Sequence, residues 1–244
     1  MDAVIIAAGF GSRIRDLSES KPLTLVAGKT LIELGVRQAS AAGAAKVIVV
    51  TGHEAQRLEA YLAQLALDTG IAIMAARAPD WSLPNGYSVI AGAARADGDF
   101  LLMMADHIFS GGILAALAQA GGPDRGVTLA IDRRVTSPLI DPDDATWVET
   151  REHGFIRAIG KTITRYDATD CGAFLATQEL PAAIASAIAA GKSGSLSDGM
   201  QVLADQGRAA TMDIGDGWWL DVDDARAQAL AEAQAPRALP ELYR

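Results

Sequence analysis

Short, uninterrupted apolar runs recur through the first half of the chain, and each is typical of a strand buried on both faces of a sheet. Strands are predicted over residues 4–8, 46–50, 71–75, 100–104 and 127–131. The segments between them carry apolar residues at helical spacing, which predicts helices over residues 29–42, 54–67, 88–96 and 111–120. This alternation of strands and helices predicts a parallel sheet covered by helices.

The pattern changes after about residue 132. A hairpin is predicted from strands over residues 146–150 and 155–159, and a further strand over 173–176. The rest of the chain reads as helices over 179–190 and 196–206, a strand near 209–214 and a terminal helix over 224–234. No repeat or long linker divides the sequence. We therefore expect one domain over residues 1–244, with an N-terminal half of about 1–132 and a C-terminal half of about 133–235.

Composition and charge narrow the classes of function. Half of the 244 residues are hydrophobic, enough for a full core, and the formal net charge is −9. A general nucleic-acid binder needs a basic face, so this charge argues against nucleic acid as a partner. Cys171 is the one cysteine, which excludes an internal disulfide and a cysteine-based zinc site. No signal peptide and no run long enough for membrane insertion is visible, so we expect a cytoplasmic protein.

A glycine-bearing loop follows the first predicted strand, with the sequence AAGFGSR at residues 7–13. Glycines let backbone N–H groups approach and cradle a phosphate. The P-loop pattern is absent, and a dinucleotide fingerprint would need a glycine where Ile14 stands. The glycines alone are equally consistent with a tight turn. Arg13, Arg15 and Lys21 follow them, however, and cations beside such a loop favour a polyphosphate ligand.

Carboxylates follow two apolar segments. Asp106 comes directly after the predicted strand 100–104, and Asp221 and Asp223 follow Trp219-Leu220. Carboxylates together with phosphate oxygens suit Mg²⁺, a hard cation that prefers oxygen ligands. Asp106 and Asp223 also have a plain structural alternative, because each could cap the helix that follows it, and Asp223 is the weaker metal candidate. His107 suits Mg²⁺ poorly and is expected to be structural.

The whole N-terminal signature, AAGFGSR followed by Lys21-Pro22-Leu23 and VAGKTLI, resembles that of the sugar-1-phosphate nucleotidyltransferases. Ser20 stands where that family commonly has proline, and Ile14 where it has leucine. The resemblance implies a Rossmann-like (GT-A-like) α/β fold, with a mostly parallel mixed sheet flanked by helices. It also implies that the backbone around Ala8, Gly9 and Gly11 holds the base and phosphates of a nucleotide.

The same resemblance assigns roles to three side chains and a metal. Arg13 would bind the β- and γ-phosphates, and Lys21 would contact the α-phosphate, so both are expected to be catalytic. Asp106 and Asp221, with Asp223 as a further candidate, would hold Mg²⁺. Since the attacking phosphate oxygen is already ionised, this chemistry needs positioning and positive charge rather than a general base.

The later motifs resemble the CTP:inositol-1-phosphate cytidylyltransferases, beginning with PNGYS at residues 84–88 and including WLDVD at 219–223. That resemblance implies condensation of CTP with inositol-1-phosphate to CDP-inositol and pyrophosphate. It places Asn85, Gly86 and Ser88 beside the nucleotide. It places Lys161, Asp170 and Gly172 beside the acceptor. In some organisms such a domain is fused to a membrane CDP-alcohol phosphotransferase; this chain would be the stand-alone form, acting with such an enzyme.

Two alternatives stay open at this point. The first is the same chemistry with another pair of substrates: UTP or CTP with a hexose-1-phosphate, MurNAc-1-phosphate or phosphocholine. The partners expected in general are thus CTP and a phosphorylated polyol or sugar. The second is a non-catalytic nucleotide-sensing subunit. A protein of that second kind would be expected to have lost a metal-binding aspartate or the lysine, and here Asp106, Asp221 and Lys21 are all present. The sequence gives no indication of an oligomeric state.

Overall fold

The computed structural model describes residues 1–11 and 20–243. The elements of the N-terminal half are β1 (Asp2–Ile6), η2 (Lys21–Leu23), β2 (Leu25–Val26), β3 (Lys29–Thr30), α1 (Leu31–Ala41), β4 (Val47–Thr51), α2 (Ala55–Thr69), β5 (Ile73–Arg77), α3 (Asn85–Ala93), β6 (Phe100–Met104), β7 (His107–Phe109), α4 (Ile113–Leu117) and β8 (Val127–Asp132). Those of the C-terminal half are β9 (Trp147–Thr150), η3 (Glu152–Gly154), β10 (Ile156–Gly160), β11 (Ala168–Ala176), α5 (Glu179–Ala189), α6 (Leu196–Asp205), β12 (Ala209–Asp213), β13 (Trp219–Asp221), α7 (Ala225–Ala238) and η4 (Pro240–Leu242).

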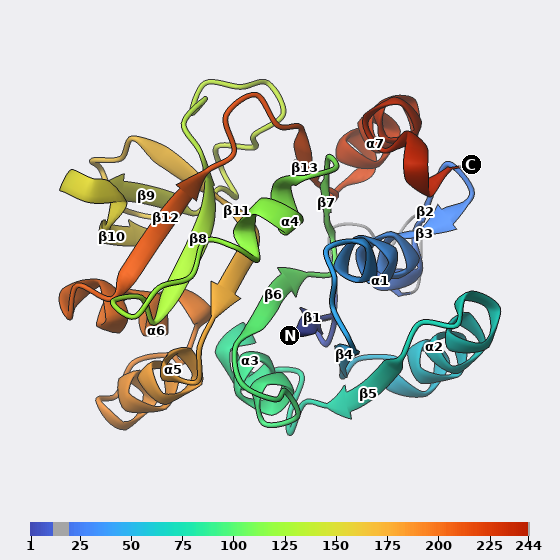
Figure 1. The fold of residues 1–244 in the computed structure, drawn as a ribbon, viewed down its shortest axis with the longest axis horizontal. Coiled ribbons are helices and arrows are strands. Elements are labelled where there is room, and N and C mark those ends of the chain that lie inside the picture. The colour runs from blue at the N-terminus through green and yellow to red at the C-terminus, as the bar shows by residue number, and fades with distance from the viewer. Residues whose placement is uncertain (12–19, 244) are drawn as a thin grey trace.

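A nine-stranded sheet runs through both halves of the described chain (Figure 1). Its main order is β10-β9-β11-β6-β1-β4-β5, with β8 paired to β11 and β12 paired to β8. The pairings run all of these strands in one direction except β10 and β11. This is the mostly parallel mixed sheet that the sequence predicts. The antiparallel strand β11 joins the two halves, because it pairs with β6 on one side and β8 on the other.

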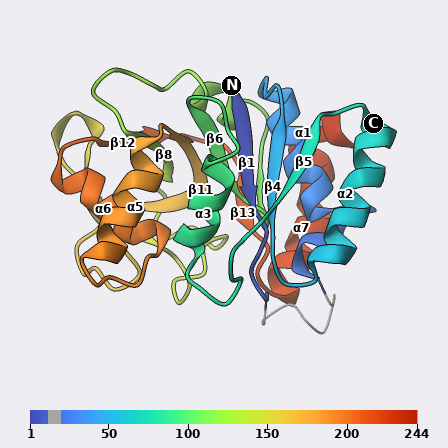
Figure 2. The same cartoon turned by 90° about the horizontal axis from the view of Figure 1, so that it is seen from below.

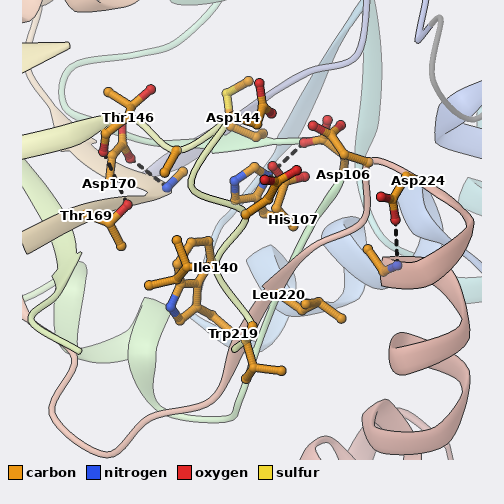
Figure 3. Close-up of a pocket in the computed structure, with 18 of the residues that line it drawn as sticks. Asp106, His107, Ile140, Asp144, Thr146, Thr169, Asp170, Trp219, Leu220 and Asp224 are labelled. Atoms are coloured by element: carbon orange, nitrogen blue, oxygen red, sulfur yellow. Dashed lines mark hydrogen bonds and ion pairs between the residues drawn. The ribbon is translucent and has the colours of Figure 1, made fainter. Parts of the chain in front are cut away.

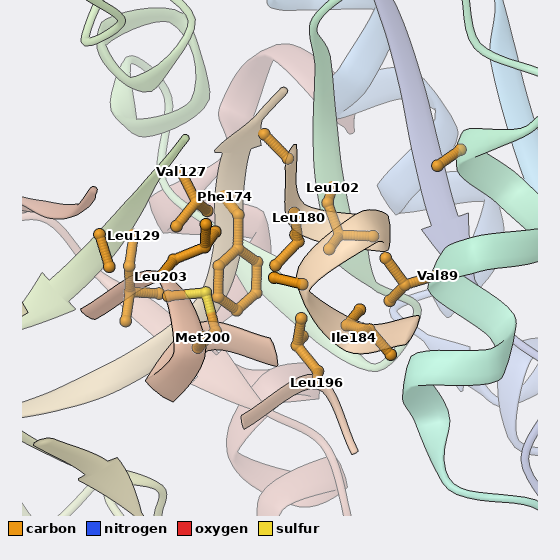
Figure 4. Packing of buried hydrophobic residues seen from close by; sticks show 14 of the residues in the cluster. Val89, Leu102, Val127, Leu129, Phe174, Leu180, Ile184, Leu196, Met200 and Leu203 are labelled. Atoms are coloured by element: carbon orange, nitrogen blue, oxygen red, sulfur yellow. The ribbon is translucent and has the colours of Figure 1, made fainter. Parts of the chain in front are cut away.

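Helices cover both faces of the sheet (Figure 2). All five residues of β1 are buried, and alternate ones face opposite layers: Val4 and Ile6 belong to one core cluster, Ala3 and Ile5 to the other. The continuous apolar run in the sequence follows from this two-sided burial. In the first cluster the ring of Phe174 lies among side chains of α5, α6 and β8 (Figure 4). A third cluster packs α7 over β7 and β13.

The predicted elements are confirmed within a few residues, with three informative differences. The helix predicted over 88–96 begins already at Asn85, because Pro84 can precede a helix and fixes its entry. The strand predicted over 173–176 begins earlier, at Ala168. The sequence does not predict this start because the polar residues Thr169 and Asp170 are typical of a loop. The three-residue strand β7 is too short to leave a recognisable sequence pattern. It forms because β13, which lies 110 or more positions further along the chain, pairs with it.

Two helical glycines on opposite faces of the sheet give a matched test of this packing. A Cβ added at Gly92 of α3 would lie 2.4 Å from Val4 Cγ1, whereas one at Gly35 of α1 would meet Ile5 Cδ1 at an ordinary 3.4 Å. We expect Gly92→Ala to lower the free energy of unfolding by about 1–2 kcal/mol through overpacking. Gly35→Ala should raise it by up to about 1 kcal/mol, because alanine favours helix. Urea unfolding midpoints measure both, and equal effects would contradict this description of the two interfaces.

Candidate active site

Two adjoining cavities open at the ends of β1, β6 and β13. The first, here called the glycine-loop cavity, has a volume of about 230 Å³ and is lined by the turn after β1, by Lys21 and by the start of α3. The second, the carboxylate cavity, has a volume of about 310 Å³ and is lined by acidic residues of both halves of the chain (Figure 3). Asn85, Met104 and Asp106 border both cavities. A group that reaches from one cavity into the other therefore passes these three residues.

The glycine-loop cavity contains most of the residues predicted to bind a nucleotide. Those that line it are Ala8, Gly9, Gly11, Lys21, Asn85 and Ser88. Gly86 does not border either cavity: a Cβ there would lie 2.2 Å from the carbonyl oxygen of Gly194, so this glycine permits a close contact between α3 and the segment before α6. Arg13 and Arg15 lie outside the described residues. The expected nucleotide contact of Arg13 is therefore not part of this geometry.

Trp81 also lines the glycine-loop cavity, although the sequence did not single it out. Its ring is stacked on Phe10 with centroids 5.9 Å apart, and His53 packs edge-on at 5.1 Å. The three residues come from the turns after β1, β4 and β5, which the parallel sheet brings to one edge. A single aromatic residue in a loop of breakers carries no signal of its own, because the cluster forms only once the strands are paired.

Lys21 connects the two cavities electrostatically. Its Nζ lies 2.5 Å from Asp106 Oδ2, and it also donates a hydrogen bond to Asp223. Gly11 makes room for this side chain: its φ is +61°, and a Cβ at that position would lie 2.6 Å from Lys21 Cβ. The predicted link between the glycine loop and the lysine is thus a direct contact. The lysine and two of the predicted metal-binding aspartates form one ion-paired group.

The strand pair β7–β13 brings the remaining charged residues together. Its antiparallel register places His107 opposite Asp221. His107 Nδ1 lies 2.8 Å from Asp106 Oδ1 and 3.7 Å from Asp221 Oδ1. The His107 ring stacks on Trp219 at 5.8 Å, and Gly172 lies against it, because a Cβ there would be only 2.4 Å from His107 Cδ2. His107 is therefore paired with the carboxylates and packed between Trp219 and Gly172; that its role is structural stays a prediction.

Burial and ion pairing shift the pKa values of the charged side chains in this cavity in opposite directions. Burial alone would lower the pKa of His107, but the carboxylates of Asp221 and Asp106 outweigh it and raise this pKa to about 9. Burial tends to raise the pKa of Asp106, yet Lys21 and His107 hold it well below its usual range. Burial dominates at Asp170 and Asp221, and raises the pKa of each to about 6. Of Asp106, Asp170 and Asp221, Asp106 is thus the one most firmly held as an anion.

The donor atoms of the carboxylate cavity fit a hard divalent cation. Ligand atoms of Asp144, Asp221 and Asp223 lie within 4.8 Å of one another, as do those of Asp106, His107 and Asp221. Within the described residues, Asp221 Oδ1 is buried and has no hydrogen-bond partner. Oxygen donors gathered in this way suit Mg²⁺. The sequence does not single out Asp144, because it lies in an acidic loop where spacing does not reveal which carboxylate turns inward.

Asp223 does not cap the terminal helix, the structural alternative considered for it. Asp224 has that role: its side chain accepts a hydrogen bond of 2.7 Å from the N–H of Ala227 at the start of α7 (Figure 3). Asp223 is instead bonded to Lys21 and borders the carboxylate cavity. The capping role considered for Asp223 thus belongs to Asp224, and metal binding by Asp223 stays a prediction.

The three residues predicted to contact an acceptor all line the carboxylate cavity. Lys161 Nζ lies 2.5 Å from Asp144 Oδ1, with 57% of its side chain exposed. Asp170 and Gly172 form a tight turn within β11, where the amide of Gly172 donates to Asp170 Oδ1 at 2.7 Å. Gly172 has φ +76°, and the pairing of β11 with β8 shifts register at this point. The irregularity directs Asp170 into the cavity instead of along the sheet.

The sequence model of the MobA-like NTP transferase domain family matches residues 3–150. The chain belongs to this family. The matched range includes the glycine loop, Lys21 and Asp106, and with them the residues that line the glycine-loop cavity. The expectation of a nucleotidyltransferase relationship from the N-terminal signature is therefore confirmed.

Relatives of this NTP transferase chain include two bifunctional proteins. It is 32% identical over 232 residues to the "Bifunctional IPC transferase and DIPP synthase" of Rubrobacter xylanophilus, covering 94% of this chain and 51% of that protein. It is 27% identical to the protein of the same name from Aquifex aeolicus, covering 91% and 48%. The chain thus spans about half the length of these relatives. Within its described residues, no helix is both long and apolar enough to cross a lipid bilayer.

Solved structures of other nucleotidyltransferases share the fold. The inositol-1-phosphate CTP transferase from T. maritima superposes with a TM-score of 0.83 at 22% identity, covering 98% of this chain and 97% of that one. A UDP-glucose pyrophosphorylase complexed with UDP-glucose gives a TM-score of 0.78 at 17% identity, covering 97% and 99%. At these identities the likeness establishes the architecture of the NTP transferase domain. It extends over the C-terminal half, beyond the residues that the family model matches.

The raised pKa of His107 predicts a pH-dependent stability. The folded protein holds this proton up to about pH 9, whereas the ordinary value is 6.5. The free energy of unfolding should therefore fall as pH rises from about 6.5 towards 9. In His107→Gln this fall should be much smaller. Urea titrations at several pH values, with EDTA present, measure it.

His153, which is exposed in η3, provides the control for that experiment. His153→Asn should follow the wild-type pH profile, because asparagine tolerates the left-handed backbone at this position (φ 62°). A wild-type stability that stays constant between pH 6.5 and 9 would contradict the ion pairing described for His107. So would an unchanged fall in His107→Gln.

Proposed function

We propose that this chain catalyses the Mg²⁺-dependent transfer of a cytidylyl group from CTP to inositol-1-phosphate, giving CDP-inositol and pyrophosphate. The observation that carries the proposal is the meeting of two cavities at Asp106, with Lys21 paired to that carboxylate. One cavity has the glycine loop suited to a nucleotide, and the other has carboxylates and a lysine suited to a phosphorylated polyol. The names of the bifunctional relatives and of the T. maritima enzyme support this choice of substrates.

The reaction joins two anions, so its main obstacle is electrostatic. An oxygen of the acceptor phosphate forms a bond to the α-phosphorus of CTP, and the bond from that phosphorus to the oxygen bridging to the β-phosphate breaks. Pyrophosphate leaves with the electron pair. The attacking oxygen is already ionised, so no side chain has to remove a proton. The protein must hold the two phosphates together and offset their charge.

The charged residues that would hold the phosphates and offset their charge come from both cavities. Lys21 would offset charge on the α-phosphate, and Arg13 would hold the β- and γ-phosphates. Asp106, Asp221 and Asp223, joined by Asp144, would hold Mg²⁺, which supplies positive charge to the phosphate oxygens when it is bound. The backbone of Ala8, Gly9 and Gly11 would approach the nucleotide closely, because these residues add little or no side chain.

The acceptor would lie in the carboxylate cavity. Lys161 would hold its phosphate, since its Nζ is at the cavity wall and its side chain is only partly covered. Asp170, beside the turn at Gly172, would accept hydrogen bonds from polyol hydroxyls. Several hydroxyls and one phosphate match a cavity lined by acidic groups together with the cations Lys161 and Arg226.

We also infer the setting in which the product is used. The chain would act in the cytoplasm, and a membrane CDP-alcohol phosphotransferase would consume CDP-inositol. The support is that this chain spans about half of relatives whose names combine two activities. The chemistry is consistent with this division, because a CDP-activated group is the substrate that such an enzyme transfers.

A substrate panel tests the proposed function. Pyrophosphate release would be measured with Mg²⁺ and each of four NTPs, against inositol-1-phosphate, glucose-1-phosphate, MurNAc-1-phosphate and phosphocholine. We expect the highest kcat/KM with CTP and inositol-1-phosphate. Asp106→Asn should reduce it by at least about 100-fold, because the central anion of the site is lost.

Asp124→Asn is the control for this series, because Asp124 is exposed and borders neither cavity. Turnover with a different pair, such as UTP and glucose-1-phosphate, would replace the substrates but keep the chemistry. Binding of CTP without turnover in any pair would favour a nucleotide-sensing protein and contradict the proposed reaction.

The role of Lys161 gives a separate prediction. Lys161→Met should raise the KM for the acceptor by about 10- to 100-fold, the effect of losing one charge-assisted hydrogen bond of about 1.5–3 kcal/mol. The KM for CTP should change little, because Lys161 borders only the carboxylate cavity. The exposed Lys192 serves as control, with Lys192→Met expected to match the wild type. A rise in the KM for CTP equal to that for the acceptor would contradict this assignment.

A further inference from the structure

Asn85 links the two halves of the chain at the border between the cavities. It is the first residue of α3, and its Oδ1 accepts a hydrogen bond of 2.8 Å from the backbone N–H of Leu196, the first residue of α6. A backbone N–H can bond only to an acceptor, so this contact fixes which end of the amide faces Leu196. The Nδ2 group therefore points away from α6. Among the described residues, no acceptor is bonded to it.

The backbone around the Asn85 side-chain amide is closely packed. Gly86 follows Asn85, and a Cβ there would meet the Gly194 carbonyl oxygen at 2.2 Å and Ile184 Cγ2 at 2.8 Å. Ser195 and Asp198 close a capping box at the start of α6, with a 3.1 Å hydrogen bond from the Asp198 amide to the Ser195 hydroxyl. The Leu196 amide is thereby fixed in place. Because the Leu196 amide holds Asn85 Oδ1, the Asn85 side chain is held as well. Its Nδ2 donor therefore has little freedom to lose when a ligand accepts its hydrogen bond.

The position of Asn85 distinguishes it from other residues of the nucleotide segment. Ser88 and Trp81 border only the glycine-loop cavity, whereas Asn85 shares with Asp106 and Met104 the border to the carboxylate cavity. A group that recognises a base needs to lie only in the nucleotide's own cavity. Asn85 is a neutral residue at the border that Asp106 also lines, and in the proposed reaction this border is where an acceptor phosphate would meet a nucleotide.

We propose that the Asn85 Nδ2 group donates a hydrogen bond to the α-phosphate of the nucleotide and positions it for attack, instead of recognising the base. This inference rests on the proposed function, since it assigns a contact within the same reaction. During the transfer, the acceptor-oxygen bond to the α-phosphorus forms and the bond to the departing pyrophosphate breaks. The amide keeps its protons throughout. Its contribution is a fixed donor toward a group whose negative charge it stabilises.

Two variants separate this role from base recognition. Asn85→Asp still accepts the Leu196 hydrogen bond but replaces the donor by an acceptor, and Asn85→Ala removes both. We expect kcat for pyrophosphate release to fall by about 100-fold or more in each, as when one fixed donor to a transition state is removed. The ratio of kcat/KM for CTP to that for UTP should stay as in the wild type. A lost CTP preference with kcat preserved would overturn the proposal, as would an unchanged kcat.

A binding measurement gives a second readout that does not need turnover. The affinities of CMP and cytidine would be compared by calorimetry or by NMR titration. In both variants the CMP preference over cytidine should drop about tenfold, while cytidine binds as to the wild type. Loss of cytidine affinity with the preference kept would identify a base contact and overturn the proposal. This readout separates failure of the Asn85 assignment from failure of the proposed reaction, because it uses only nucleotide binding.

Thermal unfolding checks that the variants are folded. Asn85→Asp keeps the acceptor for Leu196 and should melt within a few degrees of the wild type. If Asn85→Ala is unstable, the Asp variant still carries the test. A fall in kcat that merely follows a fall in melting temperature across the two variants would show a structural role only, and would overturn the proposal.

Discussion

The site depends on one constraint: carboxylates from distant parts of the chain are held close together in a partly buried place. Like charges at this separation repel, and burial weakens the screening by water. Asp106 is stable there as an anion because it lies between two cations, Lys21 on one oxygen and His107 on the other. Each of these contacts requires a specific structural feature. Gly11 gives space to the lysine, and Gly172 gives space to the imidazole.

The mixed sheet is what brings these carboxylates together. Parallel strands bring the glycine loop, the end of β6 and the aromatic cluster to one edge, which is how α/β sheets commonly build ligand sites. They do not by themselves enclose the carboxylate cavity, which residues of both halves of the chain line. The antiparallel strand β11 carries the chain back past that edge, and its irregularity at Asp170–Gly172 turns a carboxylate and a bare backbone towards the end of β6. The short β7–β13 pair then supplies His107 and Asp221 from the opposite side.

Much of this could be predicted from the sequence, and the failures have physical reasons. The buried strands were predictable because two-sided burial leaves continuous apolar runs. Lys21 was predictable because it stands at a fixed place in a local signature, and Asp106 because it directly follows one of the predicted strands. Asp144, Trp81 and β7 were not, since each acquires its role through contacts with segments far away in the chain. Gly86 had the right neighbours in sequence but lies against Gly194, behind the cavity wall. The proposed roles of Lys161, Asp170 and Arg13 stay predictions, although the first two line the expected cavity.

Lys21 illustrates how a strongly acidic protein can be suited to anionic substrates. Its ammonium is bonded to Asp106 and Asp223, in a position between the glycine-loop cavity and the carboxylate cavity. A phosphate in the glycine-loop cavity would compete with these carboxylates for the same protons. A divalent cation on Asp223 would have the opposite effect, because it would satisfy that carboxylate and release the lysine to face the phosphate. Metal and nucleotide binding are thus expected to reinforce each other through this one side chain, and the net charge of −9 does not prevent it because the balance is set locally.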